Sequence, residues 1–194
     1  TTAATHGRTM LVKEMGNNAG WLTLYAGIAA GADAILIPEI PFNIDKVCEA
    51  VLNNYKAGKP CNIIAVAEGA VLDSEAPYKK KERAFVRASR GETTVTSHLA
   101  EVIGERTGAE TRATVLGYIQ RGGNPSAYDK ALSTRLGSYA GMLAKEGRFG
   151  VTVAVSGSKI TFNALQDVAG KYKLVDPASE IVRAAEDIGV CMGR

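Results

Sequence analysis

Residues 117–123 read GYIQRGG and combine side chains that suit the binding of a phosphate group. The guanidinium of Arg121 can form two parallel hydrogen bonds with phosphate oxygens. Tyr118 and Gln120 add hydrogen-bonding side chains, and the two adjacent glycines allow the backbone to turn tightly. An apolar run precedes this segment and a helix-like run follows it. The pattern predicts an anion-binding connector at the end of a strand, although an arginine taken alone is more often a surface ion-pair partner.

The ends of two other apolar runs carry related chemistry. One ends in Met15-Gly16-Asn17-Asn18, and another ends in Glu68-Gly69. In an open α/β sheet, ligands bind outside the carboxyl ends of the strands. A carboxylate, an arginine and several glycines at that edge would suit a polyhydroxylated anion. Each residue also has an ordinary explanation, as a turn glycine or a surface glutamate, so the functional interpretation depends on their meeting at one edge of the sheet.

Arg8 and Arg112 stand at the amino ends of two of these runs. A strand rises about 3.3 Å per residue, so Arg8 should lie roughly 20 Å or more from Met15. Arg112 should be similarly far from Arg121. The two sets of residues cannot easily serve one ligand within one subunit. Arg8 and Arg112 are therefore either ordinary surface residues, which the sequence alone favours, or they face a different molecule.

Strand-like and helix-like segments alternate along the chain. Apolar runs typical of strands buried on both faces lie near residues 8–16, 33–41, 60–70 and 110–117. Helical periodicity covers residues 18–32, 43–59, 95–108 and 124–147. This alternation predicts an α/β fold with a three-layer, largely parallel sheet and helices on both faces. Asn17 or Asn18 is the expected N-cap of the first of these helices.

Two parts of the chain depart from this alternation. Residues 71–94 are polar, include the run KKKER, and are expected to form a surface insertion, with a basic anion-binding arm as the alternative. Beyond about residue 150, a strand pair and a closing helix are expected. We therefore expect an α/β ligand-binding domain over residues 1–123 and a second part over residues 124–194.

Composition argues against several other classes of function. The 194 residues carry a net charge of +3 with acids and bases interspersed, which gives no reason to expect nucleic acid as a partner. No apolar stretch is long enough to span a bilayer, so no membrane association is expected. Three widely spaced cysteines without a CxxC pair indicate free thiols in a reducing, cytoplasmic compartment. The histidines lack metal-ligand spacing, so no metal site is expected, and no GxSxG, GxGxxG or GxxxxGK[ST] motif is present.

Three segments resemble the 6-phosphofructokinase family. They read VKEMGNNAGWLTLYAGIAAGADAILIPEIP, AVAEGA and ETRATVLGYIQRGGNPSAYDKALSTRLG. The last is long and highly specific, and the resemblance runs from Arg8 to the final helix. It implies a phosphofructokinase-like fold and a glycolytic enzyme that transfers a phosphoryl group from ATP to the 1-hydroxyl of fructose 6-phosphate. This chain would supply the fructose 6-phosphate site.

The resemblance also implies roles for individual residues. Met15, Gly16 and Glu68 would hold the sugar. Arg121 would bind the 6-phosphate together with Tyr118. In the best-known bacterial members a histidine stands at the position of Tyr118, but a phenol can still donate to a phosphate oxygen.

The same resemblance offers an explanation for the distant arginines. Arg8 and Arg112 match family arginines that reach into the sugar-phosphate site of the neighbouring subunit. Such a shared site would require a homodimer or a homotetramer.

Other positions depart from the family pattern. Asn17 replaces an arginine that helps with the transferred phosphoryl group in the best-known bacterial members, so the source of that charge is open. Lys13-Glu14 replaces the more usual Glu-Val, and residues 71–94 lengthen the chain relative to the compact bacterial form. The sequence MGN followed by AGW also occurs in the branch of the family that includes pyrophosphate and mixed-donor enzymes.

The family's glycine-rich nucleotide loop, aspartate base and metal-binding carboxylate are expected upstream of residue 1. Mg²⁺ with ATP, or with pyrophosphate, would be bound mainly by that N-terminal donor-binding part, which is missing here and on which residues 124–194 would pack. Phosphoryl transfer depends on positioning and charge, so this chain alone is expected to be inactive. The alternatives are a pyrophosphate-dependent phosphofructokinase and a non-catalytic sugar-phosphate-binding module of the same fold.

Overall fold

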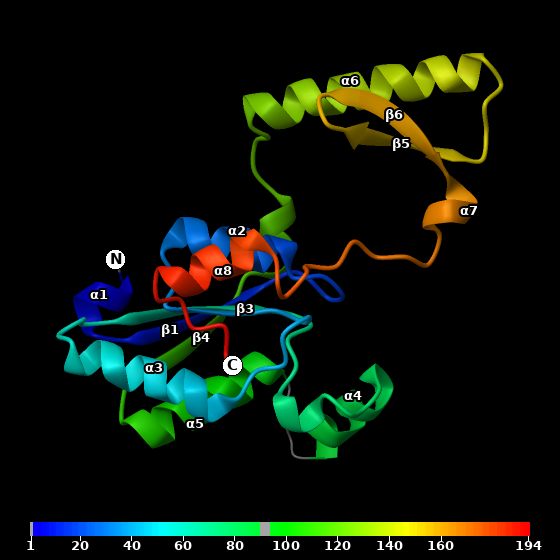
Figure 1. Ribbon diagram of the computed structural model, residues 1–194. Coiled ribbons are helices and arrows are strands. Elements are labelled where there is room, and N and C mark those ends of the chain that lie inside the picture. The colour runs from blue at the N-terminus through cyan, green and yellow to red at the C-terminus, as the bar shows by residue number, and fades with distance from the viewer. Residues whose placement is uncertain (1, 90–93) are drawn as a thin grey trace. The chain divides into compact units, whose positions relative to one another are not determined.

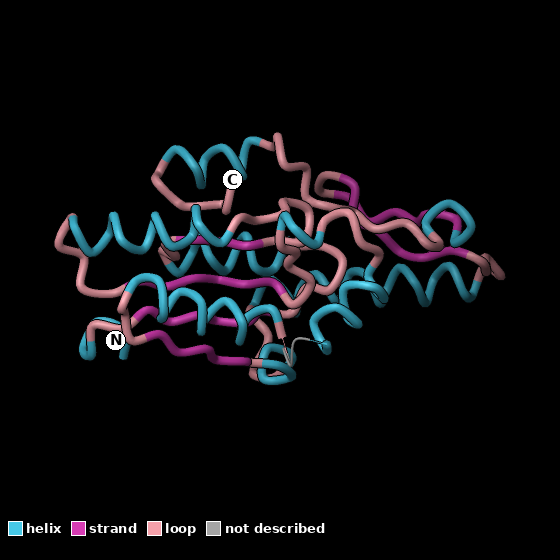
Figure 2. Tube along the Cα trace, turned by 90° about the horizontal axis from the view of Figure 1, so that it is seen from below, coloured by secondary structure: helices cyan, strands magenta, loops and turns pink. Residues whose placement is uncertain are grey.

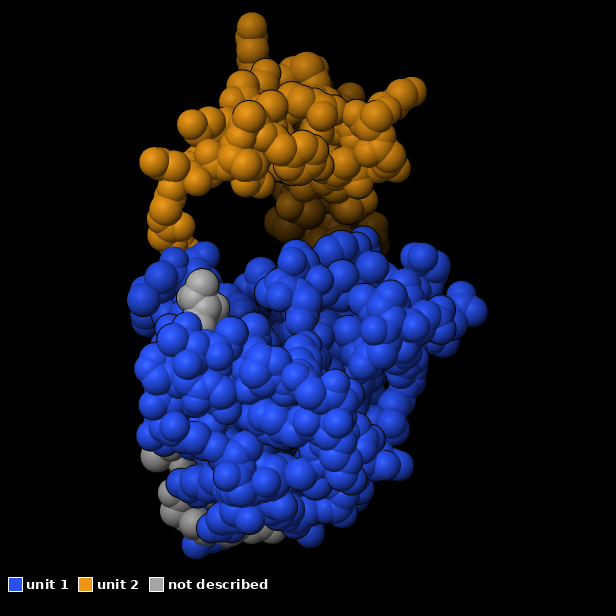
Figure 3. All heavy atoms as spheres, turned by 90° about the vertical axis from the view of Figure 1, so that its left-hand side faces the viewer, with its two compact units in different colours: residues 1–120, 173–194 blue, residues 121–172 orange. Residues whose placement is uncertain are grey.

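The computed structural model describes residues 2–89 and 94–194. The chain forms two compact units (Figure 3). Unit 1 consists of Thr1–Gln120 and Lys173–Arg194, and unit 2 consists of Arg121–Tyr172. Each unit has its own sheet, so the two are described separately.

Unit 1 is built on a four-stranded sheet in which all neighbouring strands are parallel. Its strands are β1 (Thr9–Glu14), β2 (Ala34–Leu36), β3 (Asn62–Ala67) and β4 (Thr111–Val115). Their order is β2-β3-β1-β4, so β1 lies between β3 and β4. Because the strands are parallel, the carboxyl ends of these three neighbours meet at one edge. The predicted parallel α/β architecture is confirmed.

Helices cover both faces of this sheet, as Figures 1 and 2 show. On one face, α3 (Ile44–Lys56) and α5 (Val95–Thr107) pack Val47 and Leu99 against strand residues such as Leu11. On the other face, α2 (Trp21–Ala30) and α8 (Glu180–Asp187) form a second apolar cluster with the sheet. Successive side chains of a strand point to opposite faces, so the nearly unbroken apolar runs supply both cores. The result is the three-layer arrangement expected from the sequence.

The start of α2 differs from the prediction. Neither Asn17 nor Asn18 is its N-cap, because the helix begins after Gly20. The backbone N–H of Gly20 donates to both carboxylate oxygens of Glu39, at 3.0 and 3.1 Å. A distant carboxylate thus satisfies a backbone donor that a local cap would otherwise serve, which leaves the two asparagine side chains available for other contacts.

Three short segments complete the first part of unit 1. A helix that was not predicted, α1 (Thr2–His6), precedes β1. The expected surface insertion is partly helical, with a 3₁₀ turn η1 (Asp73–Glu75) and the helix α4 (Lys80–Ser89). Residues 90–93 of that insertion lie outside the described residues. A second 3₁₀ turn, η2 (Gly117–Arg121), follows β4.

Unit 2 contains the long helix α6 (Ala127–Lys145), the antiparallel pair β5 (Val151–Ser156) and β6 (Lys159–Ala164), and the short helix α7 (Leu165–Val168). The predicted strand pair is therefore present. A capping box starts α6, in which the hydroxyl of Ser126 and the carboxylate of Asp129 each accept from the other's backbone N–H.

The division of the chain differs from the expected boundary at residues 123 and 124. The segment after unit 2, including α8, belongs to unit 1. Val182 and Ala185 of α8 are buried against the sheet cluster that contains Leu24. The apolar face of this short helix is thus already covered by unit 1, so residues 173–194 do not join residues 124–172 in one second part.

Candidate functional site

The carboxyl ends of β1 and β3 are held together by backbone hydrogen bonds. Glu68 donates its backbone N–H to the carbonyl of Glu14 at 2.9 Å, and Gly69 donates to the carbonyl of Gly16 at 3.0 Å. Gly16 has a φ of 136°, which other residues rarely adopt. A Cβ on Gly69 would lie 2.1 Å from the carbonyl oxygen of Asn17. Both glycines are therefore required for this close approach of the two strand ends.

Gln120 joins the turn after β4 to the end of β1. Its side-chain oxygen accepts from the backbone N–H of Met15 at 2.7 Å. Its side-chain nitrogen donates to the carboxylate of Glu14. One amide thus uses its acceptor and its donor on two successive residues of β1 and the turn that follows. The sequence placed Gln120 at this edge, and the structure shows that it connects η2 to β1.

Glu14 is a buried acid, with 8% of its surface exposed. Burial raises the pKa of its carboxyl group above the ordinary value, because the charged form loses contact with water. The hydrogen bond from Gln120 partly replaces that water. This network of Glu14 and Gln120 fixes the backbone from which Met15 and Gly16 project.

The predicted ligand-binding residues lie at the two opposite ends of the strands, and those at or after the carboxyl ends are Met15, Gly16, Glu68, Tyr118 and Arg121. Unit 1 brings Met15 and Gly16 against Glu68, whose side chain is exposed at the edge of the sheet. Tyr118 in η2 is 80% exposed. Arg121 is also exposed, is the last residue of η2 and is the first residue of unit 2.

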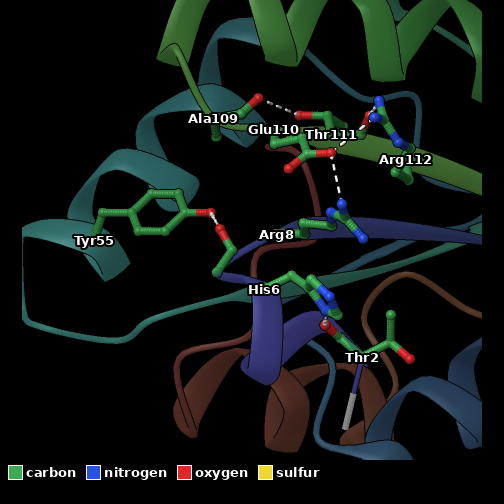
Figure 4. Close-up of polar contacts among 9 residues, drawn as sticks. Thr2, His6, Arg8, Tyr55, Ala109, Glu110, Thr111 and Arg112 are labelled. Atoms are coloured by element: carbon green, nitrogen blue, oxygen red, sulfur yellow. Dashed lines mark hydrogen bonds and ion pairs between the residues drawn. The ribbon is translucent and has the colours of Figure 1, made fainter.

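Arg8 and Arg112 meet at the opposite, amino end of the sheet (Figure 4). Thr9 pairs with Thr111 in the β1–β4 register. Arg8 and Glu110, the residues just before this pair, therefore lie side by side, and Arg112 follows two residues after Glu110. Arg8 lies 2.9 Å and Arg112 2.7 Å from the same carboxylate oxygen of Glu110. The hydrogen bond from Arg8, helped by the positive charge of Arg112, lowers the pKa of Glu110.

Glu110 does not use all of the hydrogen-bonding groups of these two arginines. The side chain of Arg112 is 60% exposed. The Nε atom of Arg8 is buried and, within the described part of the chain, has no hydrogen-bond partner. Glu110 neutralises only one of the two positive charges, so this end of the sheet keeps a net positive pair of side chains.

Two features are absent from the described residues, a metal-binding cluster and a membrane-spanning helix. Among residues 2–89 and 94–194, no group of three or more His, Cys, Asp or Glu side chains could hold a metal. Over the same residues, no helix is long and apolar enough to cross a membrane.

Two contributors were not selected from the sequence. Glu14 looked like a departure from a family pattern, and only the fold reveals that it is buried beside Gln120. Lys80 belongs to a lysine run that resembled a solvated loop, yet its ammonium group contacts Asn17 and Asn18 at the end of β1. Neither contact has a local sequence signal, because the partners are more than 60 residues apart.

Curated proteins of known activity resemble this chain over nearly its whole length. ATP-dependent 6-phosphofructokinase 3 of Bacteroides thetaiotaomicron is 42% identical over 192 residues, which cover 99% of this chain and 52% of that protein. Pyrophosphate–fructose 6-phosphate 1-phosphotransferase of Amycolatopsis methanolica is 44% identical over 91% of this chain and 52% of its own length. The chain thus spans about half the length of the curated relatives it matches.

Solved structures agree with this likeness. Phosphofructokinase from Saccharomyces cerevisiae matches 86% of this chain and 21% of its own, with a TM-score of 0.70 and 32% identity. The pyrophosphate-dependent phosphofructokinase from Marinobacter aquaeolei matches all of this chain and 51% of its own, with a TM-score of 0.73, and at 20% identity it supports the fold alone. A sequence model described as Phosphofructokinase matches residues 1–144. With most of its length matched in sequence and fold, the chain belongs to the phosphofructokinase family.

Proposed function

We propose that this chain supplies the fructose 6-phosphate site of a glycolytic 6-phosphofructokinase, which transfers a phosphoryl group from ATP to the 1-hydroxyl of the sugar. The observation that carries the proposal is the connection of three neighbouring strand ends. The side chain of Gln120 accepts a hydrogen bond from the backbone of Met15, and the backbone N–H of Gly69 donates to the carbonyl of Gly16. Residues from separate parts of the chain therefore meet at the carboxyl edge of the sheet. The activities for which the Bacteroides and Amycolatopsis relatives are named support the choice of sugar phosphate.

Within this site, each residue has a role that follows from its chemistry. Met15 and Gly16 position the sugar through a backbone that the Gln120 network holds. Glu68 accepts hydrogen bonds from sugar hydroxyls, since its carboxylate is exposed at the sheet edge. Tyr118 and Arg121 bind the 6-phosphate, with the guanidinium supplying most of the charge-assisted hydrogen bonding.

Arg8 and Arg112 serve the site of a neighbouring subunit. They sit at the amino end of strands whose carboxyl ends hold Met15 and the turn with Tyr118. A rigid strand separates the two ends, so one ligand cannot use both within a subunit. A homodimer or a homotetramer with shared sites follows, because a two-fold interface can bring one protomer's amino-end pair to its partner's sugar.

The phosphoryl donor and its Mg²⁺ bind mainly to a part of the protein outside this chain, which also supplies the catalytic base. Residues 121–172 pack against that donor-binding part, and this chain alone is inactive. The three free cysteines support a cytoplasmic location.

Pyrophosphate is the second candidate donor. Asn17 carries no charge, and the Amycolatopsis relative is named for pyrophosphate. A non-catalytic sugar-phosphate-binding module of the same fold is the remaining alternative, since a fold does not determine an activity.

The test uses the full-length protein with fructose 6-phosphate and either ATP or pyrophosphate. Formation of the 1,6-bisphosphate with ATP supports the proposal, and exclusive use of pyrophosphate would replace the donor. Arg121→Ala should raise KM for fructose 6-phosphate about 10- to 100-fold, because a hydrogen bond to a charged group contributes about 1.5–3 kcal/mol. Binding of the sugar phosphate without turnover with either donor would favour the non-catalytic module.

A further inference from the structure

The segment after β3 is anchored to the sheet rather than solvated. Arg87 of α4 donates through Nε to both carboxylate oxygens of Glu75, at 3.0 and 3.1 Å, and its Nη2 atom also contacts that carboxylate. The same Nη2 donates to the carbonyl of Ala70 at 3.3 Å. Glu75 is 1% exposed, so its carboxylate is buried, whereas the side chain of Arg87 is partly exposed. These contacts hold α4 beside the carboxyl end of β3.

This anchoring brings Lys80, the first residue of α4, to the turn after β1. Its Nζ atom donates to the side-chain oxygen of Asn17 at 2.8 Å and to that of Asn18 at 3.3 Å. Both partners are neutral amides, so they orient the ammonium group without neutralising it. Asn17 directly follows Met15 and Gly16 in the chain.

The position of Lys80 is not explained by the stability of its own helix. A cation in the first turn of a helix faces the positive end of the helix dipole, which is unfavourable. An exposed lysine also gives up side-chain freedom when it is held in one place. The ammonium group of Lys80 is therefore held at the edge of the candidate site despite two unfavourable effects. An anion that binds at that edge would give this position a function.

We propose that Lys80 is an affinity-determining cation of the site and binds a phosphate group that lies over the turn after β1. A lysine binds phosphate as a point charge with up to three donors. Asn17 and Asn18 act as positioning residues, because they hold the ammonium group. Arg87 acts one step further back, because it holds α4. The proposal rests on the proposed function for the identity of the reactant, which is either the sugar phosphate or the phosphoryl donor.

The experiment compares three variants of the full-length protein, Lys80→Met, Lys80→Arg and Lys81→Met. Lys81 is the matched control, since it is the neighbouring exposed lysine of α4 and lines a separate hollow together with Tyr78 and Phe85. Isothermal calorimetry measures the dissociation constants for fructose 6-phosphate, ATP and pyrophosphate separately, and melting temperatures check that the variants fold.

Lys80→Met should weaken the binding of at least one of these ligands about 10-fold or more, because a hydrogen bond to a charged group is lost. The ligand that weakens identifies the phosphate that Lys80 holds. Lys80→Arg should retain most of the affinity, and Lys81→Met should match the wild type. A purely structural role of Lys80 would not give this rescue by a second cation.

Equal affinities of Lys80→Met and the wild type for all three ligands would overturn the proposal, as would an equal loss in Lys81→Met. Binding that depends on Lys80 in a protein without phosphofructokinase turnover would support the proposal and reject the proposed function. Turnover of fructose 6-phosphate that is indifferent to Lys80 would do the reverse. A wild-type protein that binds none of the three ligands would contradict both.

Discussion

The side-chain amide of Gln120 donates a hydrogen bond to the carboxylate of Glu14, which lies 106 positions earlier in the chain. Its oxygen accepts from the backbone N–H of Met15. A single side chain therefore sets the position of η2 against β1. The residue next to it in the chain, Arg121, is the proposed phosphate ligand.

Gln120→Leu should lower both stability and sugar affinity. The substitution leaves the N–H of Met15 without its partner, at a cost of about 1–3 kcal/mol. We expect a lower melting temperature and a raised KM for fructose 6-phosphate in the full-length enzyme. Ile119→Ala, on the same turn and 78% exposed, is the control and should change neither. A stable Gln120→Leu variant with unchanged KM would remove Gln120 from the support of the site.

Glu14→Gln should change how stability depends on pH. The pKa of Glu14 in the folded protein is raised above its ordinary value of 4.5. Because the folded protein holds the proton of Glu14 more tightly than the unfolded chain does, protonation of Glu14 stabilises the fold. This stabilisation is fully present below the pKa of Glu14 in the unfolded chain and is lost as the pH rises through its pKa in the folded protein. The variant keeps a side-chain acceptor for Gln120 without an ionisation.

The melting temperature of Glu14→Gln relative to the wild type should therefore rise as pH increases through that window, and the gain should level off above it. Melting curves over a pH series test this expectation. A difference between the two proteins that is the same at every pH would mean that Glu14 titrates normally.

Glu110→Gln should have the opposite pH signature. The pKa of Glu110 is lowered by Arg8 and Arg112, so its stabilisation is present above the unfolded pKa and is lost as pH falls through the folded pKa. The variant should lack this acid-dependent loss. Since the group is exposed, the effect should be small and should shrink in high salt. Glu105→Gln, another exposed glutamate, should retain the wild-type acid profile.

Arg87→Met should release α4 from the sheet. Removal of one partner leaves the buried Glu75 carboxylate without its cation, which typically costs about 3–5 kcal/mol. Amide hydrogen exchange should accelerate across residues 80–89, and the melting temperature should fall. Arg87→Lys should recover part of the protection, since it restores a charge but not the forked geometry. Slow exchange in Arg87→Met would show that α4 is held by other contacts.

The parallel sheet could be predicted from the sequence because its signal is local. Each strand is a short apolar run, and each run is followed by a helical repeat. The sequence also indicated that Arg8 and Arg112 stand at the amino ends of two strands, but not that those two strands are neighbours in the sheet. The N-cap of α2 could not be predicted, because Glu39 reaches Gly20 from another segment.

The contacts of Gln120, Arg87 and Lys80 could not be predicted for the same reason as the contact of Glu39 with Gly20. Each is a side-chain contact between segments that only the tertiary fold brings together. The role of α8 was missed for a related reason. It was expected to pack with the rest of residues 124–194 on the upstream donor-binding part, whereas it returns to the sheet of unit 1.

Subunit complementation tests the shared sugar-phosphate site most directly. Full-length Arg112→Ala and Arg121→Ala are mixed under conditions in which subunits exchange, and are assayed at a fructose 6-phosphate concentration far below their raised KM values, at which each variant alone has little activity. One hybrid site then combines an intact Arg112 from one protomer with an intact Arg121 from its partner, while the opposite site carries both lesions. We expect activity to return to a fraction of the wild-type value. No recovery despite demonstrated exchange, or an active monomer, would contradict a site shared between subunits.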